Sequence, residues 1–243
     1  PSGSDQLELY NVLKSENQLT ILRFSGFLQD TWSYKYLDNE YYFTAGLRTT
    51  YLDLSKQFLV SPRVNFSFKP SWEKDLMFHL SAGVYYQPPF YKEMRDVYGK
   101  LNEDLKAQQS IHLVAGSDYI FSAWNRPFKL SSELYYKRLR NLVPYKVDNV
   151  RIAYAGENLA SGYAMGIDFK INGEFVPGSE SWASLSFMQT REDIDGDIFL
   201  QTNEDGSQEY YEPGYYPRPT DQLMTFGLFF QDYLTLKTIV VLQ

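Results

Sequence analysis

The sequence contains no cysteine and only two histidines among its 243 residues. The lack of cysteine excludes disulfide bonds and thiolate metal sites. His79 and His112 lie far apart, each within a strand-like segment, so a catalytic or zinc site built on histidine is not expected. We therefore predict that the chain is not an enzyme, with no catalytic residues, no metal and no cofactor.

Three further absences limit the function. No apolar run approaches the roughly 18 residues that a transmembrane helix needs, although a mean hydropathy of −0.40 is compatible with barrel strands, in which only alternate residues are apolar. The net charge of −7 shows no basic surplus for a nucleic-acid partner. The opening segment, PSGSDQLELY, is not a signal peptide, so either the protein is cytosolic or the sequence starts within a longer protein.

What the sequence does have is aromatic residues, at 17%, and a hydrophobic period of two. Tyrosine and phenylalanine favour half-buried β-strands. In segment 58–68 the residues Phe58, Val64 and Phe66 alternate with Arg63 and Asn65, which separates an apolar face from a polar one. We predict about ten strands, within or near 22–33, 41–48, 58–68, 76–87, 109–121, 128–137, 163–172, 182–190 and 224–230, with a final one from Leu236.

The length and the ends of these segments favour a membrane barrel. Strands of ordinary sheets have a most common length of about 5–6 residues, whereas a tilted membrane-crossing strand needs about 9–11. Most of the predicted segments reach the longer range. Aromatic residues also lie near the segment ends, as in the girdles of membrane barrels: Trp32, Tyr51, Trp72, Tyr86, Tyr119, Trp124, Tyr136 and Trp182.

The connections alternate in length, as periplasmic turns and extracellular loops do. Short connections are predicted at 34–39, 70–75, 122–127 and 176–181. Long polar connections are predicted at 88–106, 146–162 and 192–217, and only the connection near 53–57 breaks the rule by being short.

Several segments follow one another in an order that carries a family resemblance. They are Ser61-Pro62-Arg63, a strand-to-loop passage at 83–91, a loop-to-strand entry at 101–108, a Gly-x-Asp strand at 161–168 and a strand at 182–190. In this order they resemble segments of the barrel of TonB-dependent outer-membrane receptors, and the resemblance covers most of residues 21–231.

The resemblance implies an all-β, antiparallel transmembrane β-barrel in the cell outer membrane, with about ten strands of a larger, 22-stranded barrel. The sequence shows no plug-like segment or energy-coupling box, and it stops within an alternating strand that lacks a terminal aromatic residue. We therefore expect residues 1–243 to be a partial barrel domain, truncated at both ends, from which the plug domain and the remaining strands are absent. Expected partners are the TonB energy-coupling complex through the missing plug, outer-membrane lipids and, as a further candidate, a surface lipoprotein.

Three functions remain open. The main hypothesis is active import of a large nutrient, such as an iron chelate or an oligosaccharide, with energy from TonB. A passive porin-like or structural outer-membrane barrel would share the strand and loop pattern but would need no plug. A soluble all-β binding module would turn its apolar face inward instead.

The candidate substrate contacts are loop side chains, which could stack on a ligand or hydrogen-bond to it: Tyr91, Arg95, Tyr98, Tyr210, Tyr211, Tyr215 and Tyr216. The alternative is that these loops pack on their neighbours, on the rim or at the membrane interface. Asp193, Asp195 and Asp197 resemble a calcium loop only in part, because Gly196 falls at the fourth position and not the sixth. Charged side chains are also expected inside the barrel, and pairing among them is favoured over contact with a substrate: Arg63, Glu133, Lys137, Asp168 and Lys170.

Overall fold

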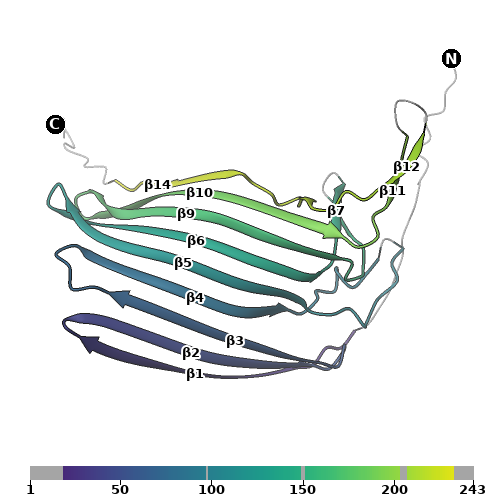
Figure 1. Cartoon of the computed structure of the whole chain (residues 1–243), viewed down its shortest axis with the longest axis horizontal. Coiled ribbons are helices and arrows are strands. Elements are labelled where there is room, and N and C mark those ends of the chain that lie inside the picture. The colour runs from purple at the N-terminus through teal and green to yellow at the C-terminus, as the bar shows by residue number, and fades with distance from the viewer. Residues whose placement is uncertain (1–18, 97, 149–150, 203–206, 233–243) are drawn as a thin grey trace, which may run out of the picture.

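The computed structural model describes residues 19–96, 98–148, 151–202 and 207–232. These residues form β-strands and their connections (Figure 1). No helix among them is long and apolar enough to cross a membrane.

One large antiparallel sheet contains ten strands in the order β1-β2-β3-β4-β5-β6-β9-β10-β13, with β14 also paired to β10. The strands are β1 (Arg23–Tyr36), β2 (Asn39–Leu52), β3 (Gln57–Lys69), β4 (Asp75–Gln87), β5 (Gln108–Ala123), β6 (Arg126–Leu142), β9 (Ala160–Val176), β10 (Ser179–Ile194), β13 (Tyr216–Pro217) and β14 (Met224–Phe229). Two separate hairpins join β7 (Tyr145–Asp148) to β8 (Arg151–Tyr154) and β11 (Phe199–Thr202) to β12 (Gln208–Tyr211). The all-β antiparallel prediction is confirmed, while the strand predicted from Leu236 lies outside the described residues.

The strands are long. The eight from β1 to β10 that belong to the large sheet have 13 to 17 residues each. Consecutive strands of these eight pair with each other, and the β7–β8 hairpin intervenes between β6 and β9. The sheet is therefore a simple meander, in which short connections place consecutive strands side by side.

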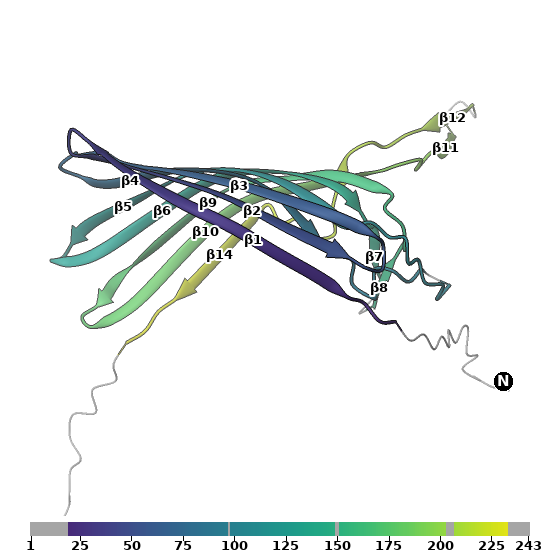
Figure 2. The ribbon, with the colours of Figure 1, turned by 90° about the horizontal axis from the view of Figure 1, so that it is seen from below.

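The two ends of the sheet differ in the length of their connections. One end has tight turns, including Leu37–Asp38 and Trp124–Asn125, in which both residues have positive φ and so match the right-handed twist of a hairpin. The other end, called the loop end here, carries the segments 88–107, 143–159 and 195–223 as well as both small hairpins (Figure 2). The predicted alternation is confirmed, including the short turn at 53–56 on the loop end.

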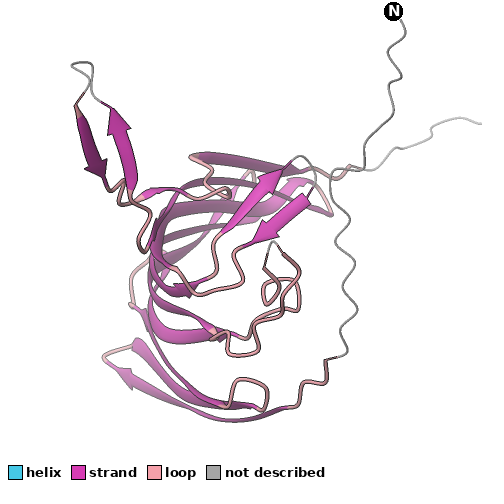
Figure 3. Cartoon of the chain, turned by 90° about the vertical axis from the view of Figure 1, so that its right-hand side faces the viewer, coloured by secondary structure: helices cyan, strands magenta, loops and turns pink. Residues whose placement is uncertain are grey.

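The sheet curves into an open arc (Figure 3) and separates two kinds of side chain. Cross-strand pairing puts one apolar row on one face: Leu80, Ala115, Leu134 and Ile167. The adjacent row, on the opposite face, contains His79, Gly116, Glu133 and Asp168. The loops curl inside the arc, and they hydrogen-bond to Gln57. The side chain of Gln57 lies on the polar face, as does that of its cross-strand partner Leu52. The polar face is therefore the concave one.

The apolar side chains of the convex face are exposed. Leu80, Leu113 and Leu134 have 56%, 55% and 60% of their surface accessible. A continuous apolar surface of this kind needs apolar surroundings, because monomeric soluble proteins rarely expose a large one. Asp30, on strand β1, is an acidic exception in the convex rows, and its carboxylate accepts a hydrogen bond of 2.8 Å from the Thr31 amide.

Gly116 has a specific packing role on the concave face. The His79 ring crosses above it to bring Nε2 within 3.4 Å of the Glu133 carboxylate on β6. A Cβ atom at Gly116 would collide with this ring and would lie 2.9 Å from the Ser132 carbonyl oxygen.

We expect Gly116→Val to displace His79 and to lower the free energy of unfolding by about 1–3 kcal/mol, the usual cost of overpacking. Urea unfolding of the purified protein measures this effect. Ala115→Val is the matched control, because the adjacent side chain points to the convex face. Equal stability of the two variants would contradict the packing role assigned to Gly116.

Candidate functional site

The segment 88–107 forms a compact loop held by its own polar groups. Glu93 is buried, and its carboxylate accepts hydrogen bonds from the Phe90 amide at 2.9 Å and from Gln108 Nε2 at 3.0 Å. The Asp96 carboxylate accepts two more, from the amides of Tyr98 and Lys100. Three of these four bonds satisfy backbone donors that no strand pairs, so the loop has a defined shape.

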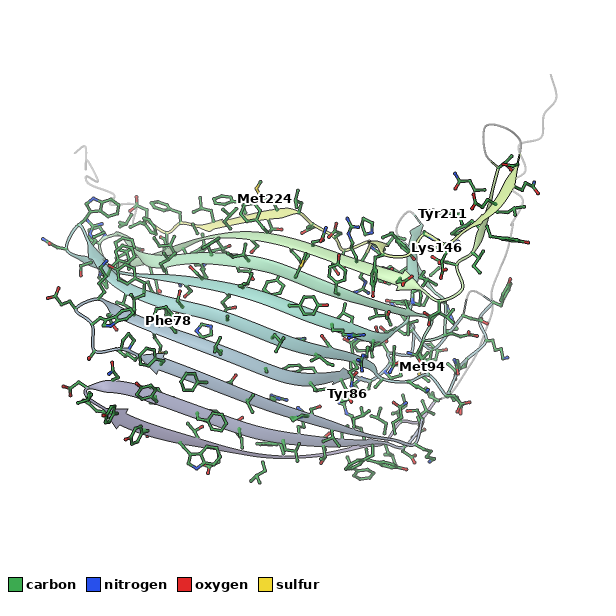
Figure 4. All side chains as sticks on the ribbon, in the orientation of Figure 1. Phe78, Tyr86, Met94, Lys146, Tyr211 and Met224 are labelled. Carbon is green, nitrogen blue, oxygen red and sulfur yellow. The ribbon has the colours of Figure 1, made fainter. Side chains whose placement is uncertain are left out.

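A small hydrophobic cluster joins this loop to its neighbours. Met94, Leu105 and Val143 are almost completely buried, with exposed fractions of 0%, 1% and 3%. Four partly buried side chains surround them: Leu19, Leu54, Leu101 and Tyr154. We call these seven residues the loop core. Figure 4 places Met94 at the loop end, at the opposite end of the sheet from Phe78.

The Tyr154 hydroxyl stays protonated in this setting. Burial raises its pKa, and the charges of Glu93 and Tyr145 raise it further. A neutral phenol can be accommodated beside the apolar side chains of the loop core, whereas a phenolate would be costly there.

Amide side chains fix the loop to the sheet. Asn158 accepts from the Lys106 amide at 2.7 Å and donates to the carbonyls of Lys106 and Asn141. Gln57 of strand β3 also bonds the loop, accepting from the Ala107 amide and donating to the Leu105 carbonyl. The loop end is therefore a preformed surface, built from segments far apart in the sequence.

Three of the predicted contact residues lie on this loop. Tyr91 and Tyr98 have exposed fractions of 39% and 82%, and Arg95 is also exposed. The loop packs on its neighbours, as the alternative interpretation expected, yet these side chains stay on its outer surface.

The four other predicted tyrosines do not form one cluster. Tyr210 and Tyr211 lie on strand β12, in a hairpin that projects away from the sheet (Figures 1 and 4). The Tyr215 ring lies 5.5 Å from the ring of Tyr163, and Tyr216 pairs with Glu192 on strand β10. Across the described ranges, no ring contact joins two of these four residues.

The acidic run Asp193, Asp195 and Asp197 spans the end of strand β10 and a turn in which Gly196 has a φ of 77°. The Asp195 amide donates to the Leu159 carbonyl at 2.7 Å. In the part of the chain that the structure describes, no group of three or more histidine or acidic side chains has metal-site geometry.

The charges predicted for the barrel interior do lie on the concave face, but with different partners. Lys137 lies above the Tyr135 ring at 4.8 Å, and Lys170 above the Trp182 ring at 5.1 Å. Glu133 contacts His79. Among the described residues no ion pair joins two of the five predicted charges, so the expected pairing among them is wrong. Cross-strand register places these cations beside aromatic rings, which attract them.

Two adjoining hollows lie on the concave face of strands β1, β2 and β3. One, with a volume of about 230 Å³, is lined by Arg23, Arg48 and Arg63, with Tyr85 of β4. The other, of about 250 Å³, again includes Arg48 and Arg63, with Phe27. Arg23 and Arg48 were not identified from the sequence, because only the register of three strands brings them together.

A larger hollow of about 550 Å³ lies on the convex face between apolar side chains such as Leu80, Leu113 and Leu134. Its walls carry almost no polar group that could orient a polar ligand. It therefore suits the acyl chains of lipids better than a nutrient.

Comparison with known protein families matches nearly the whole chain. The family model described as TonB dependent receptor-like, beta-barrel, matches residues 3–235. No match was found among curated proteins.

Proposed function

Because the chain belongs to the family of TonB-dependent receptor-like β-barrels, we propose that it is part of an importer for a large nutrient, either an iron chelate or an oligosaccharide. The family is not enzymatic, sits in the outer membrane and imports with energy from TonB. This assignment excludes the soluble module and the passive porin as functions of the chain.

The loop core is the observation that best supports capture of a large nutrient. It holds loop 88–107 and the 143–159 segment together at the end of the sheet that carries the long loops. In a barrel of this type the long loops face the exterior, and the concave face lines the lumen. A preformed surface above a polar wall suits binding of a ligand before transport, because little ordering is needed on association.

We further propose that additional strands close the sheet into a barrel of about 22 strands around a plug domain, through which TonB acts. Among the described residues β1 pairs only with β2, and β14 only with β10. Open sheet edges invite aggregation, and barrels remove them by closing. The curvature in Figure 3 suits such closure.

Ligand contacts are proposed for the exposed side chains of the loop end. Loop 88–107 offers the rings of Tyr91 and Tyr98 and the cation of Arg95, while Tyr210 and Tyr211 lie on the projecting hairpin. Tyr215 and Tyr216 lie against strand β10 or its neighbour and would contact a ligand only at the rim. Outer-membrane lipids cover the convex face in this proposal, and a surface lipoprotein could bind over the loops.

We expect uptake of the nutrient to require both this gene and TonB. Cells that encode the protein are supplied with a panel of ⁵⁵Fe chelates and radiolabelled oligosaccharides, and uptake is compared between wild type, a deletion of the gene and a deletion of tonB. Uptake of at least one compound should be lost in both deletions. The plasmid-borne gene should restore this uptake in the strain that lacks the gene. Uptake that depends on the gene but continues without TonB would contradict the proposed function.

A further inference from the structure

Three arginines gather on the lumen wall just below the loops, in a chain that is acidic overall. Arg23, Arg48 and Arg63 come from three adjacent strands, and all three line the hollow of about 230 Å³. Within the described ranges none of them forms an ion pair. The chain has 30 acidic and 23 basic residues, so a group of three cations without an acidic partner needs an explanation.

The lining of the hollow suits an anion. Ser25, Thr50 and Ser61 add hydroxyl groups to its wall, and no acidic side chain is among the lining residues. Arg48 and Arg63 also line the adjoining hollow of about 250 Å³, so an anion between them could contact both spaces. The planar guanidinium group forms paired hydrogen bonds to carboxylate and phosphate, which gives these ligands an advantage over neutral ones.

A pair of aromatic rings supports Arg63. Its guanidinium carbon lies 5.3 Å from the centre of the Tyr85 ring, and that ring lies 4.4 Å from the ring of His112. Gly83 lies between Arg63 and His112 in the sheet, and it has no side chain to obstruct the Tyr85 ring. Arg63 is therefore held by a cation–π contact, which leaves its hydrogen-bond donors available for a ligand.

Charge is distributed unevenly along the lumen wall. The row that contains Arg63 continues across the sheet through Gly83 and His112 to Lys137. The acidic Glu133 lies four residues farther from the loop end than Lys137 on strand β6, and Asp168 is its cross-strand partner. Glu192 lies one concave row nearer the loop end than Lys137, but its carboxylate is paired with Arg218 at 2.9 Å. A ligand passing the loops therefore reaches Arg63 and Lys137 before Glu133 and Asp168, and such a field favours entry of an anion.

We propose that Arg23, Arg48 and Arg63 form a binding site for a carboxylate or phosphate group carried by the imported nutrient. This inference rests on the proposed import function, and it narrows the nutrient to an anionic compound, such as a carboxylate-bearing chelate or an acidic oligosaccharide. The same chemistry could come from an acidic side chain of another segment of the protein, and the experiment distinguishes the two sources.

The test is calorimetric titration of the purified receptor with citrate, and with sorbitol as a neutral probe. Citrate should bind, sorbitol should not, and the affinity for citrate should fall as salt is added. Arg48→Gln and Arg63→Gln should each weaken citrate binding by about tenfold or more, the usual effect of losing a hydrogen bond to a charged group. The affinity of Arg63→Lys for citrate should lie between those of wild type and Arg63→Gln, because lysine keeps the charge but loses the paired donors.

Arg138→Gln is the matched control, since it removes the same charge from the convex face of strand β6. Equal loss of affinity in Arg138→Gln would overturn the site. The site would also be overturned if the wild-type protein does not bind citrate and Arg48→Gln and Arg63→Gln unfold more easily. The arginines would then pair with an acidic side chain of the protein itself. The titration needs no TonB. Citrate binding without TonB-dependent uptake would therefore reject only the import function, whereas the reverse result would reject only the anion site.

Discussion

Leu80→Arg is expected to remove most of the assembled receptor from the outer membrane. Leu80 lies near the middle of strand β4 on the apolar convex face, with 56% of its surface exposed. An arginine at the bilayer midplane of a barrel costs about 2–4 kcal/mol, which corresponds to roughly a 30- to 700-fold change in a folding equilibrium. This cost arises because lipid cannot solvate the guanidinium group.

Ser81→Arg is the matched control, one residue further along the same strand. Ser81 pairs with Val114 and Asn65 in a row of the concave face, where a charge meets water or polar groups. We expect this variant to assemble nearly as well as wild type. Assembly is measured as folded receptor in isolated outer membranes, and stability as urea unfolding in lipid vesicles. Poorer assembly of Ser81→Arg than of Leu80→Arg would reverse the assignment of the two faces.

The sequence alone predicts the strands well where one face must be apolar. Segments 58–68 and 76–87 become Gln57–Lys69 and Asp75–Gln87 in the structure. Alternation is reliable here because the membrane demands an apolar residue at every second position. The short turns are also predictable, since Asp, Asn, Gly and Pro have local conformational preferences.

Strand ends at the loop side are predicted less well. Segment 128–137 becomes Arg126–Leu142, and Arg138 and Arg140 continue the convex rows beyond the apolar positions. The alternation of apolar residues ends where a strand leaves the membrane, whereas backbone pairing continues beyond that point. For the same reason the hairpins β7–β8 and β11–β12 were expected only as polar loops.

The candidate sites depend on contacts that are distant in sequence. Met94, Leu105 and Val143 come from two connections with no shared period, so no local pattern marks them as a core. Arg23 and Arg48 become neighbours of Arg63 only through the register of β1, β2 and β3. Exposed aromatic residues of the loops, in contrast, are apparent from composition, although composition does not reveal which of them lie close together.

The second large effect is expected from Met94→Asp, in the centre of the loop core. Met94 is fully buried between Leu105 and Val143, and the buried Glu93 adjoins it in sequence. Replacing a buried methionine by a small residue costs about 2–5 kcal/mol even without a charge, and an unpaired carboxylate adds to the penalty. We expect the loops to open while the strands remain paired, because strand pairing in the sheet does not depend on this cluster.

The opening should be visible as faster proteolysis within 88–107 and 143–159, since cleavage follows the population of open loops. A cost of at least about 2 kcal/mol raises that population roughly 30-fold or more. Nutrient binding should fall with it, whereas urea unfolding of the barrel should change little. Met94→Leu, which keeps the volume, and Tyr98→Asp, which places the same charge at an exposed site, are the controls for proteolysis. If the loops of Met94→Asp are cleaved no faster than those of Tyr98→Asp, the loop core does not hold the loops together. The preformed capture surface then has no structural basis.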